Sequence, residues 1–65
     1  MPADLSAADR SGRLAARHDA RYGDVTPNPF APGTAPAGRW QEGYDDDMWR
    51  IRLYGADEVE ASGDV

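Results

Sequence analysis

The feature that most constrains this chain is a stretch rich in proline and glycine at its centre, residues 24–38. This stretch holds all but one of the prolines in the 65-residue sequence. Proline fixes φ and biases the residue before it towards extended geometry, so no helix runs unbroken through the stretch. The chain is therefore divided into two segments, and Asn28-Pro29-Phe30 lies where the chain must turn between them.

The segment before this stretch predicts a helix from about residue 6 to 22. Ser6 and Asp9 fit a capping-box pattern at its start, and Gly23 suits its end. At about 100° per residue, one side of this helix holds short side chains, which would let another helix approach closely. This small-residue face consists of Ala8, Gly12, Ala15, Ala16 and Asp19.

Four arginines share another side of the same predicted helix. They form the arginine stripe, Arg10, Arg13, Arg17 and Arg21. One interpretation is a solvated face with ion pairs between residues four apart, such as Asp9 and Arg13. The other interpretation is a contact surface for phosphates or for an acidic partner.

A second helix is predicted from about residue 35 to 54. Thr34 can cap it with Pro36 in its first turn, and Gly55 suits its end. A glycine in mid-helix costs about 1 kcal/mol relative to alanine, so Gly43 indicates a close approach of the first helix or of the linker. Residues 48–54 also alternate in part with period two, so a strand is the rival interpretation there. The predicted buried side of the helix is Trp40, Tyr44, Met48, Ile51 and Tyr54.

The two helices and the linker are predicted to form a helical hairpin or a bent pair. Aromatic residues from the linker and the second helix are predicted to form the core. We expect Phe30 to pack between the helices, with Trp40 and Tyr44 against the small-residue face. The residues that set this architecture, rather than a catalytic site, are Asn28, Pro29, Phe30, Trp40, Gly43 and Tyr44.

The opposite side of the second helix holds Trp49 and Leu53, and large apolar groups left exposed usually mark an interface. Asp45, Asp46 and Asp47 diverge by about 100° from one to the next on a helix, so they do not form a metal site. They indicate a solvated acidic patch or, alternatively, a contact with the arginine stripe of a neighbouring molecule.

Charge is divided unevenly in a sequence whose net charge is −5. Residues 1–23 carry four Arg against three Asp, whereas residues 24–65 carry three Arg against nine acidic residues. The acidic tail, residues 56–65, holds few large apolar residues and is predicted to be flexible.

A chain of this length has a small core, and its lack of cysteine excludes disulfides and thiolate zinc sites. A partner or a homodimer is therefore expected to complete the fold. The sequence has neither an apolar run that could span a bilayer nor a signal peptide, which predicts a cytoplasmic protein without membrane contact.

The pattern Gly12-x-x-Ala15, Gly23, Asn28-Pro29-Phe30 and Trp40-x-x-Gly43-Tyr44 resembles the ribosome modulation factor family, which includes short proteins linked to ciprofloxacin modification. The similarity covers residues 12–48. It implies an all-α protein of two helices and a structured loop that binds the small ribosomal subunit near rRNA. The acidic second half departs from the basic ribosomal members of the family, which leaves the arginine stripe as the part suited to RNA.

Three hypotheses of function follow. The first is a non-enzymatic interaction protein that binds the ribosome, RNA or a ribosome-associated protein through the arginine stripe, with Trp49 and Leu53 as further contacts. The second is a small acidic inhibitor, of phage origin for example, that occupies a basic groove with Trp49 and Leu53 as anchors. Its carboxylates would imitate phosphates, and they are Asp45–Asp47, Asp57, Glu58 and Glu60. The third, an enzyme that phosphorylates a small drug, is disfavoured because the sequence lacks a phosphate-binding glycine loop and any lysine. No catalytic residue, cofactor, metal or small-molecule substrate is predicted.

Overall fold

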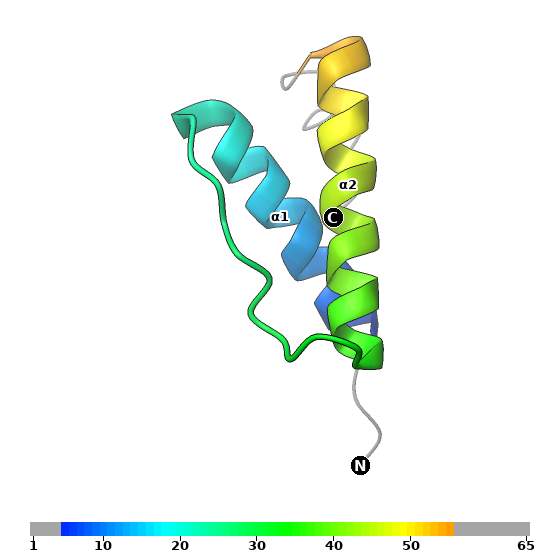
Figure 1. Ribbon diagram of the computed structural model, residues 1–65. Coiled ribbons are helices and arrows are strands. Elements are labelled where there is room, and N and C mark those ends of the chain that lie inside the picture. The colour runs from blue at the N-terminus through cyan, green and yellow to red at the C-terminus, as the bar shows by residue number, and fades with distance from the viewer. Residues whose placement is uncertain (1–4, 56–65) are drawn as a thin grey trace.

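The computed structural model describes residues 5–55, and the predicted tail lies outside them. Two α-helices make up the described chain, α1 (Leu5–Tyr22) and α2 (Ala35–Tyr54), joined by a loop of residues 23–34 (Figure 1). The residues from Met48 to Tyr54 are helical, so the strand interpretation is wrong. Over the described residues the fold class is therefore all-α, as predicted.

Local signals account for three of the four helix ends. At the end of α1, Gly23 has φ 72° and donates its N–H to the Asp19 carbonyl at 2.8 Å. At the start of α2, the Thr34 hydroxyl accepts from the Ala37 N–H at 3.3 Å, and a proline occupies the first turn. Gly55 ends α2 with φ 92° and bonds to the Ile51 carbonyl at 2.8 Å.

Ser6 does not occupy the predicted N-cap position of α1. The helix already includes Leu5, so Ser6 lies within the first turn and does not precede it. Asp9 accepts a hydrogen bond from the Arg13 Nε at 3.0 Å, one turn further along the helix.

The two helices lie side by side and run in the same direction, and they diverge towards their C-terminal ends (Figure 1). Of the two arrangements that the sequence left open, a hairpin and a bent pair, the antiparallel hairpin is thus excluded. The loop runs back along the length of α1 before α2 begins. An 18-residue helix rises about 27 Å, and a loop of this length reaches about 40 Å when extended, so a proline-rich loop suits the return.

Backbone contact between the helices is made at two glycines. A Cβ added to Gly12 would overlap the Trp40 carbonyl, and one added to Gly43 would overlap the Asp9 carbonyl. The predicted close approach at Gly43 is confirmed. The small-residue face of α1 supplies Ala8 and Ala16, exposed by 3% and 0%, to the same contact.

The core is smaller than the aromatic pattern predicts. Trp40 is only 2% exposed and stacks on Tyr44 with ring centroids 5.1 Å apart. Phe30 is not packed between the helices, since it is 36% exposed, and Tyr54 is 63% exposed. The linker is held by a polar side chain instead, because Asn28 donates to the Ala37 carbonyl at 2.9 Å and accepts from the Phe30 N–H at 3.1 Å.

Candidate interaction surface

A buried ion cluster joins α1 to α2. Asp47 is fully buried, and its two carboxylate oxygens accept from Arg13 Nη1 at 2.7 Å and from Arg17 Nε at 2.9 Å. Asp46 accepts a further bond from Arg13 Nη1 at 2.7 Å. The ion cluster, as we name it, consists of Arg13, Arg17, Asp46 and Asp47.

The ion cluster corrects the prediction of a solvated acidic patch. Asp45 points to solvent and accepts from the Gln41 amide at 3.0 Å, Asp46 is partly exposed, and Asp47 is buried. Asp47 lies on the buried side of α2 with Trp40, seven residues earlier and thus about two turns away. The carboxylates do meet the arginine stripe, but the stripe of the same molecule rather than of a neighbour.

The arginine stripe is consequently not a continuous outer surface. Arg17 is 9% exposed, and one of its guanidinium nitrogens, Nη2, is buried without a hydrogen-bond partner. Burial alone would lower the pKa of Arg13, but hydrogen bonds to Asp46, Asp9 and Asp47 outweigh it and hold that pKa above its ordinary value. Arg10 and Arg21 are exposed on α1, so only the two ends of the stripe reach solvent.

A second polar cluster ties the loop to both helices. Asp19, 3% exposed, accepts from the Thr26 N–H and hydroxyl, each at 2.7 Å, and from the Tyr44 hydroxyl at 2.5 Å. Burial alone would raise the pKa of Asp19, but these bonds and the one with His18 outweigh it and keep the carboxyl ionised well below its usual range. We name Asp19, Thr26 and Tyr44 the Asp19 cluster. Sequence reasoning placed Asp19 on the contact face but missed its partners.

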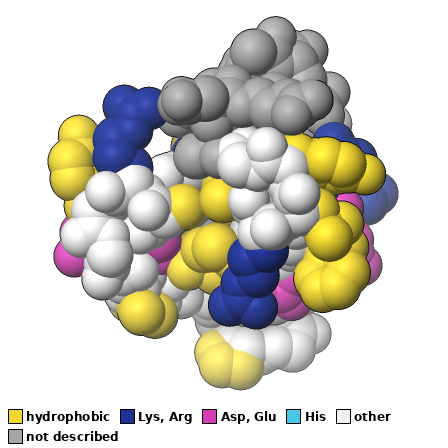
Figure 2. Space-filling view, turned by 90° about the horizontal axis from the view of Figure 1, so that it is seen from above, with side chains coloured by type: hydrophobic (Ala, Val, Ile, Leu, Met, Phe, Trp, Pro, Cys, Tyr) yellow, Lys and Arg dark blue, Asp and Glu magenta, His cyan; other side chains and the backbone are white. Residues whose placement is uncertain are grey.

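The outer side of α2 exposes large apolar groups, as predicted. Trp49 and Leu53 are 61% and 55% exposed and lie four residues apart, one turn along the helix. At helical spacing, Glu42 and Asp45 project from the same side, and both are exposed. The outer face of α2 is defined here as Glu42, Asp45, Trp49 and Leu53. Viewed from the C-terminal ends of the helices, apolar side chains reach the surface in several places between charged ones (Figure 2).

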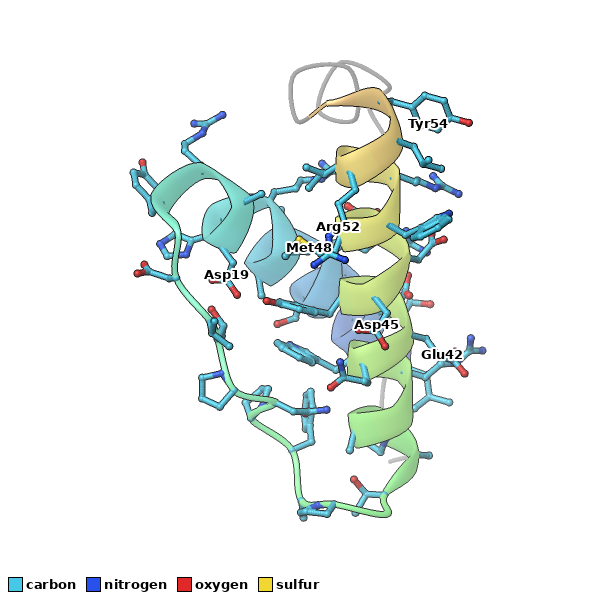
Figure 3. All side chains as sticks on the ribbon, turned by 45° about the horizontal axis from the view of Figure 1, so that its top comes forward. Asp19, Glu42, Asp45, Met48, Arg52 and Tyr54 are labelled. Carbon is cyan, nitrogen blue, oxygen red and sulfur yellow. The ribbon has the colours of Figure 1, made fainter. Side chains whose placement is uncertain are left out.

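Next to this face, the start of the loop and α2 enclose a groove of about 490 Å³. Asp45, Met48 and Arg52 follow one another along α2 in Figure 3, and all three line the groove. We name it the loop–α2 groove, and its lining is Asp24, Val25, Tyr44, Asp45, Met48, Trp49 and Arg52.

A hollow of about 600 Å³ lies near the start of α1, and charged side chains from both helices line it. These charges largely compensate one another, since Arg13 pairs with Asp9 and Asp46, and Arg39 lies 3.6 Å from Glu42. Within residues 5–55, no three carboxylate or histidine groups are placed to share a metal ion. Neither α1 nor α2 combines the length and apolarity that crossing a bilayer requires.

Comparison of the sequence with models of known protein families gives no match, and neither do comparisons with curated proteins and with solved structures. The resemblance to the ribosome modulation factor family therefore stays a prediction based on the motif residues.

Proposed function

We propose that this chain is a small non-enzymatic interaction protein that binds a basic protein surface on the ribosome through the outer face of α2. The observation that carries the proposal is the exposure of Trp49, 61% of whose surface is accessible, beside Leu53. Tryptophan is among the residues most enriched at binding hot spots, and exposed apolar patches usually mark interfaces. The buried side of α2 already has its own tryptophan, Trp40, so Trp49 is not needed for the core.

Charge favours a protein partner over RNA. The outer face of α2 places Glu42 and Asp45 around the apolar pair, and the whole chain has a net charge of −5. Phosphates would be repelled by such a surface, whereas a basic protein surface would be attracted to it. Two of the four arginines proposed for RNA contact, Arg13 and Arg17, are engaged in the ion cluster. The link to the ribosome comes from the motif resemblance.

The nucleic-acid mimic is not supported in the same way. Of its proposed phosphate analogues on α2, Asp47 is fully buried and Asp46 is bonded to Arg13, while Asp57, Glu58 and Glu60 lie outside the described residues. A mimic needs its negative charges on the surface, and among the three consecutive aspartates only Asp45 is both exposed and outside the ion cluster.

Co-sedimentation with ribosomal subunits tests the proposed function. We expect the wild-type chain to sediment with the subunits at low salt and less well at high salt, because screening weakens the charge contribution. Trp49→Ala should abolish co-sedimentation, whereas Tyr22→Ala should keep it. Tyr22 is a matched control because it is 65% exposed and lies on α1. Absence of the wild-type chain from the subunit fraction at low salt would overturn the proposal, as would equal binding of the two variants.

A further inference from the structure

The walls of the loop–α2 groove are fixed by the Asp19 cluster. Thr26, next to Val25 in the loop, is bonded to Asp19 through both its N–H and its hydroxyl. Tyr44, another lining residue, donates to the same carboxylate from α2. The loop wall and the helix wall are thus tied to one buried group, so the groove exists before any ligand binds, and preformed sites bind at lower entropic cost.

The lining of the groove combines apolar side chains with charged ones. Val25, 86% exposed, faces the groove together with Met48 and Trp49. Two carboxylates, Asp24 and Asp45, line it against a single guanidinium, Arg52. Among the described residues, Arg52 has no ion-pair or hydrogen-bond partner, so it is available to a ligand.

The spacing of Asp45 and Arg52 along α2 indicates the length of a ligand that could contact both residues. Asp45 and Arg52 are seven residues apart on α2, a rise of about 10 Å. Three residues of an extended chain span the same distance, at about 3.3 Å each. A ligand side chain at the middle position would then lie beside Met48, which comes between Asp45 and Arg52 in the sequence of α2.

We propose that the loop–α2 groove binds a short extended segment of the partner protein in which an apolar side chain is flanked by a basic residue and by an acidic one. The basic residue pairs with Asp45, the apolar one packs on Val25, Met48 and Trp49, and the acidic one pairs with Arg52. This inference rests on the proposed function, because it names the chemistry of the partner at the same side of α2. A second copy of this chain is a less suitable occupant, since its net charge of −5 repels the two carboxylates.

The experiment titrates three short peptides into the ¹⁵N-labelled chain and follows its amide and indole N–H signals by NMR. The probe is acetyl-Arg-Leu-Glu-amide, and the controls are acetyl-Arg-Ala-Glu-amide and acetyl-Glu-Leu-Glu-amide. We expect saturable shifts of the Trp49 indole and of the Val25 and Arg52 amides with the probe, in the millimolar range. The buried Trp40 indole should not shift, and both controls should bind more weakly.

Two variants with the same change of charge locate the site. Asp45→Asn should weaken probe binding about threefold or more, because it removes a charge from the groove. Ser11→Arg changes the net charge by the same amount and is the matched control: Ser11 is exposed on α1 and does not line the groove, so binding should be unchanged.

The groove proposal is overturned if the probe causes no saturable shift, if the shifts map elsewhere, or if both variants bind equally. Shifts of the Trp49 indole that depend on protein concentration before peptide is added would overturn it in favour of a second copy. Its failure and that of the proposed function are distinguishable. If the chain binds the probe but does not sediment with ribosomal subunits, the groove proposal is supported and the partner is a protein outside the ribosome.

Discussion

Asp47 lies between two guanidinium groups inside the contact of the helices, with no exposed surface of its own. Removing one partner of a buried ion pair costs about 3–5 kcal/mol, because it leaves the other charge unpaired. A core of this size supplies about 3–5 kcal/mol in total. We therefore expect Asp47→Ala to be largely unfolded by far-UV circular dichroism. Asp45→Ala, at an exposed position, should change the free energy of unfolding by no more than about 0.5 kcal/mol. Equal helix content and equal melting curves for the two variants would contradict this role.

Tyr44 should ionise late in an alkaline titration. Its burial and its bond to the Asp19 carboxylate raise the pKa of Tyr44 to about 12. The pKa in the unfolded chain is about 10, so the contribution of Tyr44 to stability is complete below pH ~10 and is lost as the pH rises through about 12. Absorbance of tyrosinate should show a step near pH 12 that Tyr44→Phe lacks. A wild-type titration that is complete well before that step would show that the bond to Asp19 is absent in solution.

At the scale of elements, the signals that predicted structure correctly are local ones. Thr34, Pro36 and the glycines at positions 23 and 55 act on the backbone within one turn, and they give the ends of the helices. Gly43 is a helix-breaking residue inside a helix, and such a conflict indicates a close contact. These residues were sufficient for the fold class and for the contact face.

The interactions between elements were not predictable in the same way. The spacing of the arginine stripe is compatible with an outer face, and only the position of α2 turns Arg13 and Arg17 towards Asp47. Helical spacing likewise separates Asp45 from Asp47, but nothing in the sequence says which side of α2 meets α1. The prediction that Phe30 is buried was wrong for a related reason. The hydrogen bonds of Asn28 set the path of the loop, and the sequence alone does not reveal these bonds.

Substitution of the contact glycines tests the packing of the elements. Glycine to alanine in a helix normally stabilises by about 1 kcal/mol. At Gly43 the new Cβ would overlap the Asp9 carbonyl, so we expect Gly43→Ala to destabilise by about 1–3 kcal/mol. Gly38→Ala is the control on the same helix, because a Cβ there meets nothing within 4 Å, and it should raise stability. Urea unfolding of both variants measures the difference, and stabilisation by both would mean that the helices are further apart than described.

At the scale of the whole molecule, the direction of the helices makes the loop a structural element. Parallel helices need a connection that returns along their length, and this one is anchored near its start by Thr26 and at its middle by Asn28. Asp19 is the point where α1, the loop and α2 all meet. The ionisation state of the Asp19 carboxyl therefore affects how α1, the loop and α2 pack together, and with it the shape of the loop–α2 groove.

Lowering the pH should consequently destabilise the packing of both helices and the loop together. The pKa of Asp19 is held well below its ordinary value of about 3.9, so its contribution to stability is present above that value and is lost as the pH falls through the folded pKa. We expect the free energy of unfolding, measured in urea, to decrease steadily below about pH 4. In Asp19→Asn the slope with pH should be shallower, because the residue no longer binds a proton. Parallel curves for wild type and variant would mean that the bonds from Thr26 and Tyr44 do not stabilise the ionised form of Asp19. The loop would then have to be held by Asn28 alone.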